Sequence, residues 1–186
     1  MESKALKQTR RTSQNLALLA SLIIAAAARA GDAPESKLML TGYADAAAGG
    51  ALLSGHYQSV IVQLGEHGPL YTQDAVAAST NLCVAYIMTR QWTEAHAACD
   101  GAVASARAVR FDPSLWARRM QDEQVAVAYS NRAILHHLEA DATSATADIT
   151  AARTFAPEAE FVSHNLAVLA GAKSAAAPAI VRGAES

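Results

Sequence analysis

Two cysteines, Cys83 and Cys99, are the residues of this 186-residue chain best able to form a covalent cross-link. Each lies eight positions from Gln91, where a turn between two helices is expected. In an antiparallel helical hairpin their side chains would lie at the same level and face each other. The spacing therefore predicts a Cys83–Cys99 disulfide, which would stabilise the fold by roughly 3 kcal/mol. The alternative is a pair of free, buried thiols.

The six histidines do not form a recognisable metal-binding or catalytic pattern. His136 and His137 are adjacent, so on a helix their side chains diverge by about 100° and cannot easily share a metal ion. The sequence contains no H-E-x-x-H motif, no G-x-S-x-G motif and no phosphate-binding loop. We therefore expect neither enzymatic activity nor a bound cofactor or metal.

The segment 1–30 has the layout of an export signal. A basic head is followed by an uncharged apolar run over 16–28, and then by Ala28-Arg29-Ala30, a pattern read by signal peptidases. The run is long enough for a signal core and short for a membrane span, although an uncleaved anchor is the alternative. We expect cleavage after Ala30 and a periplasmic or secreted protein, in an oxidising compartment that favours the disulfide.

The composition favours helices in close contact and argues against nucleic acid as a partner. Hydrophobic residues make up 52% of the chain and charged residues 17%, which suffices for a core. The chain is also rich in alanine, the best helix former. Its formal charge is −2. Removing 1–30 would leave 10 basic and 16 acidic residues, a net charge of −6, so binding to nucleic acid or to membrane phosphates is not expected.

Two segments of the chain share their internal spacing. Asn81 is followed by alanines at positions 95 and 102, and Asn131 by alanines at the equivalent positions 145 and 152. A third asparagine, Asn165, lies further along the chain. Small residues, Cys83 and Ala133, occupy equivalent positions where two helices would have to touch closely. Larger side chains there would cost about 1–3 kcal/mol.

These features resemble the tetratricopeptide repeat, a 34-residue helix–turn–helix unit, and the interval from Asn131 to Asn165 equals that repeat length. The resemblance covers residues 41–170 and is most specific over 76–157. It implies an all-α fold of stacked antiparallel helical hairpins, a tetratricopeptide-like α-solenoid. We expect two clear repeats, one degenerate repeat around Gly55 whose first helix is weakened by Gly49-Gly50, and a capping helix over Phe161–Ala170. A generic helical bundle is the alternative.

The expected domain organisation follows from these assignments. A signal peptide occupies 1–30, a polar lead-in 31–40 and the repeat domain 41–170, while the residues 171–186 read as a disordered tail. The second clear repeat has an extended first helix, expected from about Ser114 to Glu139.

The concave face of a stacked-repeat fold is the first candidate for a binding surface, because the first helix of each unit lines it. Its apolar candidates are Val84, Ile87, Met88, Ile134, His137 and Leu138. Such a groove suits an amphipathic helix or the chain's own tail. The alternative is that these residues are ordinary core, covered by neighbouring helices.

A second candidate surface lies near the start of the long helix, where arginine and tryptophan cluster. Its residues are Arg110, Trp116, Arg118 and Arg119. Both residue types are enriched at the centres of protein interfaces. The alternative is a solvated helix end with Trp116 folded back on the hairpin.

The sequence thus favours an exported adaptor or scaffold that binds a protein or peptide partner through an apolar concave groove. The alternative is a structural accessory protein of the cell envelope that self-associates through the arginine- and tryptophan-rich surface. No membrane span is expected after signal cleavage.

Overall fold

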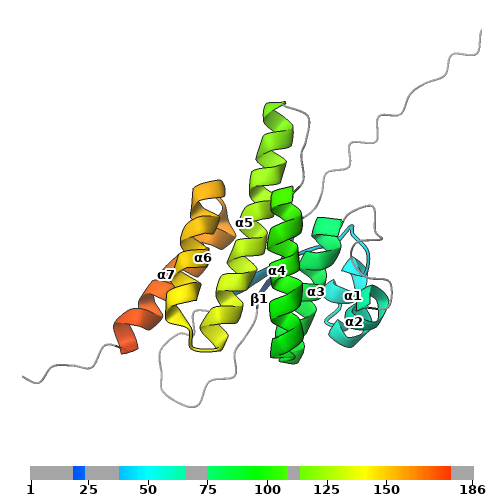
Figure 1. Ribbon diagram of the computed structural model, residues 1–186, viewed down its shortest axis with the longest axis horizontal. Helices are drawn as coiled ribbons and strands as arrows, with labels where there is room; N and C mark the ends of the chain where they lie inside the picture. Colours follow the sequence, from blue (N-terminus) through cyan, green and yellow to red (C-terminus); the bar gives the residue numbers. More distant parts are fainter. Residues whose placement is uncertain (1–18, 24–37, 66–74, 109–113, 177–186) are drawn as a thin grey trace, which may run out of the picture.

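The computed structural model describes residues 19–23, 38–65, 75–108 and 114–176. Its helices pack in sequential antiparallel pairs, as Figure 1 shows. In chain order they are α1 (Gly49–Leu53), α2 (Tyr57–Gly65), α3 (Ala75–Thr89), α4 (Trp92–Ala108), α5 (Leu115–Leu138), α6 (Ala142–Phe155) and α7 (Glu160–Ala176). The expected helical hairpins are therefore present, as α3–α4 and α5–α6.

The structure also contains a two-stranded antiparallel ribbon, which was not predicted from the sequence. β1 (Leu19–Ile23) pairs with β2 (Met39–Tyr43), with Leu19 opposite Tyr43 and Ile23 opposite Met39. β1 lies inside the apolar run expected to be the core of the signal peptide, and β2 begins inside the expected polar lead-in. β2 contacts the alternate helices α3, α5 and α7.

The long helix α5 starts and ends within one residue of the expected bounds. The Ser114 hydroxyl caps its N-terminus by accepting a hydrogen bond from the Ala117 N–H at 3.3 Å. The last helix, α7, runs to Ala176 and so continues past the expected end at Ala170. The expected cleavage position at Ala30 and the part of the expected tail over 177–186 lie outside the described residues.

The degenerate first unit is shortened where its two glycines stand. α1 has only five residues and is separated from α2 by a turn at Gly55, which has a positive φ of 74°. A Cβ on Gly49 would lie 2.1 Å from the Ala44 carbonyl oxygen, so the tight connection from β2 into α1 requires glycine there. Gly49, one of the two glycines that weaken α1 as a helix, thus lets β2 turn directly into it.

The predicted disulfide is confirmed. Cys83 on α3 and Cys99 on α4 are bonded, with a Cα–Cα distance of 4.7 Å, and both side chains are fully buried. The bond clamps the first hairpin at the level where its two helices pack closely.

Removing this cross-link should lower the free energy of unfolding by about 3 kcal/mol, because the unfolded chain regains the entropy of a loop whose ends are 16 positions apart. The variant is Cys83→Ala with Cys99→Ala, and urea unfolding followed by circular dichroism measures the change. A reductant should weaken the unaltered protein by a similar amount and leave the double variant unaffected. Equal stability of the oxidised and reduced protein would contradict this expectation.

Helix α6 begins at a charged cap. Asp141 accepts a hydrogen bond from the Ser144 N–H at 3.0 Å. Hydrogen bonds from the Ser144 side chain and backbone hold the pKa of the Asp141 carboxyl below its ordinary value. An acid with a lowered pKa in the folded state adds stability above its unfolded pKa, and that stability is lost as the pH falls through the folded value.

The variant Asp141→Asn keeps the capping oxygen and removes the charge. We expect it to melt below the unaltered protein at pH 7. The difference should close as the pH falls below about 3.9, the ordinary value for an aspartate. Thermal melts at pH 7, 5, 4 and 3 provide the measurement, and a gap between the two melting temperatures that is as wide at pH 3 as at pH 7 would contradict it.

Candidate functional site

Three buried asparagines lie on the alternate helices α3, α5 and α7. Asn81 lies on α3, Asn131 on α5 and Asn165 on α7, and all three are fully buried. A carboxamide in such a place is costly unless its oxygen and its nitrogen both find hydrogen-bond partners.

The backbone of β2 supplies these partners. Each carboxamide accepts a hydrogen bond from the N–H, and donates one to the C=O, of a single strand residue. The pairs are Asn81 with Tyr43 (2.7 and 2.9 Å), Asn131 with Thr41 (3.0 and 2.7 Å) and Asn165 with Met39 (2.8 and 2.8 Å). We call the three residues Asn81, Asn131 and Asn165 the asparagine ladder.

The ladder acts towards β2 as a neighbouring strand would. A side-chain amide presents the same donor and acceptor as a peptide unit. Residues 39, 41 and 43 alternate along the strand, so their N–H and C=O groups all face the same edge. The contact therefore recognises extended backbone and is indifferent to the strand's side chains.

Further contacts fix the ladder and the strand in place. Asn165 also donates to the buried Ser130 hydroxyl at 2.9 Å, which orients its carboxamide. A Cβ on Gly42 would lie 2.3 Å from Leu52 Cδ2, so a larger residue there would require the buried Leu52 side chain of α1 to shift. Leu40 and Thr41 are fully buried. β2 is thus an integral part of the folded helical domain.

The other edge of β2 faces β1. Because residues 39, 41 and 43 face the ladder, the N–H and C=O groups of Leu40 and Gly42 face the opposite way. Leu22 and Ala20 of β1 lie opposite them. Among the described elements, β2 is the only one with which β1 makes extensive contact. The helices therefore bind one edge of β2, and β1 pairs with its other edge.

The apolar groove expected on the concave face is not open in this structure. Val84, Ile87 and Ile134 are buried in a hydrophobic cluster that also contains Leu40 of β2, Leu52 of α1, and Val60 and Leu64 of α2. Met88 and His137 are partly buried, while Leu138 is exposed. The chain's own N-terminal elements pack on Val84, Ile87 and Ile134, so these three residues are core, the alternative that the sequence left open.

The second candidate surface is exposed where it is described. Trp116 is 69% exposed and its neighbour Leu115 is 81% exposed, so Trp116 is not folded back on the hairpin. Arg118 and Arg119 are exposed as well, whereas Arg110 lies outside the described residues. The start of α5 projects beyond the adjoining helices (Figure 1).

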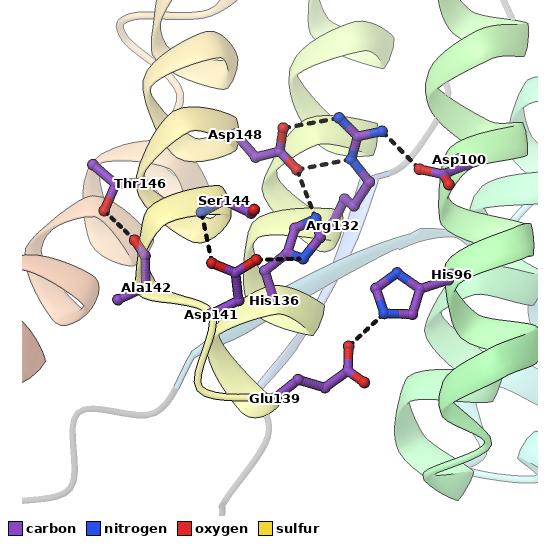
Figure 2. A network of polar contacts seen from close by, with 10 residues as sticks. All are labelled: His96, Asp100, Arg132, His136, Glu139, Asp141, Ala142, Ser144, Thr146 and Asp148. Atoms are coloured by element: carbon purple, nitrogen blue, oxygen red, sulfur yellow. Dashed lines mark hydrogen bonds and ion pairs between the residues drawn. The ribbon is translucent and has the colours of Figure 1, made fainter.

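A network of polar contacts joins α4, α5 and α6 (Figure 2). Arg132 donates two hydrogen bonds to Asp148, at 2.7 and 2.9 Å, and one to Asp100 at 2.7 Å. The hydrogen bonds to Asp148 raise the pKa of Arg132 above its ordinary value. This network links α4 of one hairpin to α5 and α6 of the other.

Two histidines of the network meet only because the hairpins pack. The ring centroids of His96 and His136 lie 5.5 Å apart, although no motif in the sequence indicated that they converge. His96 pairs with Glu139, and His136 lies 3.6 Å from Asp148. Among the described residues, no group of three or more His, Cys, Asp or Glu side chains is placed to hold a metal ion. The histidines therefore belong to the network between the hairpins.

In the sequence, the three asparagines served to align the predicted repeats, and no role was predicted for them. What marks them in the sequence is a polar residue that recurs at the centre of apolar helices, where a buried carboxamide needs hydrogen-bond partners. Those partners are backbone groups of a distant segment, which side-chain patterns do not reveal. No protein-family model matches the chain, and comparisons with curated proteins and with solved structures likewise find no match.

Proposed function

We propose that this chain is an exported, tetratricopeptide-type adaptor that binds an extended segment of a partner protein. The asparagine ladder is the observation that carries this proposal. Three amides on the alternate helices α3, α5 and α7 hold six backbone groups of one extended strand. A surface organised in this way supports recognition of extended polypeptide through its backbone.

The repeat character is supported by the spacing and the packing together. Asn131 and Asn165 are separated by one repeat length and make the same contact with β2, as does Asn81 in the preceding hairpin. An identical function at equivalent positions is what stacked copies of one structural unit would provide.

Export is supported by the leader-like segment 1–30 and by the disulfide, which is consistent with an oxidising compartment. Within the described ranges, no helix is both long and apolar enough to cross a membrane.

A binding assay tests the adaptor function. The chain is tagged at its C-terminus, expressed with residues 1–30 in place and recovered from the envelope fraction. N-terminal sequencing of the recovered protein tests cleavage after Ala30. Biolayer interferometry then compares two forms of α-lactalbumin, one reduced and alkylated with iodoacetamide, which adds no charge, the other native. We expect binding of the unfolded form alone, and equal retention of both forms or of neither would overturn the proposal.

The exposed Trp116 and Leu115 favour a second candidate function, self-association of an envelope protein through the start of α5. Size-exclusion chromatography at two protein concentrations, with Trp116→Ala beside the unaltered chain, separates the two functions. A concentration-dependent oligomer that Trp116→Ala abolishes would favour self-association. An adaptor would remain monomeric, and Trp116→Ala would still bind the unfolded polypeptide.

A further inference from the structure

The two strands differ in what holds them. β2 is fixed by six hydrogen bonds from the asparagine ladder and by the close approach of Gly42 to Leu52. Among the elements that the structure describes, the backbone of β1 makes its extensive contacts with β2. Loss of β1 would therefore leave the ladder and the helical core intact.

An edge that loses its partner strand presents unpaired backbone groups. Without β1, the N–H and C=O groups of Leu40 and Gly42 would face outward along a strand that cannot move, because its other edge is bound to the ladder. Such a fixed, unpaired edge is a template for another extended chain. Rigidity matters here, because a strand already held in place loses little entropy when it pairs.

We propose that the outer edge of β2 is a strand-addition site for an uncharged, apolar, extended segment of a partner protein, and that β1 occupies it as an intramolecular stand-in. This inference rests on the proposed adaptor function and specifies where the partner binds. The partner segment runs antiparallel to β2, and two of its residues take the places of Ala20 and Leu22, opposite Gly42 and Leu40.

The chemistry expected of the partner segment follows from β1, the segment that pairs with this edge in the structure. Residues 19–23 read Leu-Ala-Ser-Leu-Ile, with no charge and no proline. Proline would remove a donor from the hydrogen bonds between the strands. The net charge of −6 expected after loss of residues 1–30 further disfavours acidic segments.

The expected signal cleavage would regulate access to the outer edge of β2. Ala30 lies between β1, which ends at Ile23, and β2, which begins at Met39. Cleavage after Ala30 would separate β1 from the rest of the chain. The edge is then closed in the precursor and opens once the leader has been removed.

Paired variants of the full-length chain test whether β1 covers this edge. Leu22→Pro removes an N–H that faces β2, whereas Ser21→Pro, its matched control, removes one that faces away. Amide hydrogen exchange by NMR reports on each residue of β2. In Leu22→Pro we expect the amides of Leu40 and Gly42 to exchange about tenfold faster or more. The amides of Met39, Thr41 and Tyr43 should stay protected by the ladder, as all five should in Ser21→Pro.

A peptide supplied in trans tests whether the open edge accepts a segment. The peptide spans residues 17–25 with a lysine tail for solubility, and it is added to the full-length Leu22→Pro chain. We expect it to restore protection at Leu40 and Gly42. Methylating the peptide nitrogen of Leu22 should weaken binding about tenfold or more, while methylating that of Ser21 should leave binding unchanged.

Two results would overturn the strand-addition site. One is full protection of Leu40 and Gly42 in Leu22→Pro, which would mean that β1 does not cover them. The other is equal weakening by the two methylated peptides, which would mean that binding does not use the strand edge. A peptide that binds as expected, in a protein that ignores unfolded α-lactalbumin, would support the edge site and reject the general adaptor function.

Discussion

Replacing Arg132 by methionine is expected to lower the free energy of unfolding by about 3–5 kcal/mol. Arg132 holds Asp148 through two hydrogen bonds, and the Asp148 side chain is only 10% exposed. Methionine retains most of the apolar stem and removes the charge. The buried carboxylate of Asp148 would then lose both hydrogen bonds and keep only the His136 imidazole, 3.6 Å away, and removing one member of a buried ion pair in this way is costly.

Two further variants identify the cause of that loss. Asp100→Ala removes the outer partner of Arg132, whose side chain is 61% exposed, and should cost less than about 1 kcal/mol. Combining Arg132→Met with Asp148→Leu removes both buried charges and should recover most of the stability. Urea unfolding measures all of these variants. If Arg132→Met cost no more than Asp100→Ala, the network would not join the hairpins as described.

The parts of the fold that follow from nearby residues could be predicted from the sequence. The recurring alanines placed the helices of both clear hairpins, because small residues at helical spacing leave a readable period. The Cys83–Cys99 disulfide followed from equal distances to one turn. The long helix α5 was located to within a residue at each end, since its cap and its apolar period are local features.

The ribbon could not be predicted, because its pairing joins segments that carry no strand signal of their own. Residues 19–23 belong to an apolar run that reads equally well as a signal core, and periodicity does not separate the two. β2 is buried by helices far along the chain, and its Met39 pairs with Asn165 near the other end of the domain. Only the assembled helices create the surface that makes an extended strand favourable there.

The burial of Val84, Ile87 and Ile134 could not be predicted for a related reason. A helix face such as that of Val84 and Ile87 has the same apolar pattern whether it is open to a partner or covered by the chain itself. The sequence kept both readings, and the contacts of Leu40 and Leu52 with these residues favour the second. The asparagine ladder differs from this apolar face. Its polar residues lie within apolar helices, and they mark the surface that binds the backbone of β2.

The ladder itself yields the other large prediction. Asn131→Leu keeps nearly the same shape and removes the carboxamide at the centre of β2. The N–H and C=O of the buried Thr41 would then lose both partners. An unsatisfied buried group costs about 1–3 kcal/mol, so we expect the free energy of unfolding to fall by about 4 kcal/mol. Urea unfolding gives the value.

The control is Ser130→Ala, which removes a neighbouring buried hydroxyl but leaves Asn165 its two bonds to Met39. It should cost about 1 kcal/mol. Hydrogen exchange then shows how Asn131→Leu loses stability. If β2 keeps its place against α3, α5 and α7, only the Thr41 amide loses protection and the full cost of about 4 kcal/mol appears. If β2 detaches into water, Met39 and Tyr43 lose protection too, because the three carboxamides hold one strand together. A cost equal to that of Ser130→Ala, with Thr41 still protected, would mean that the ladder does not hold β2.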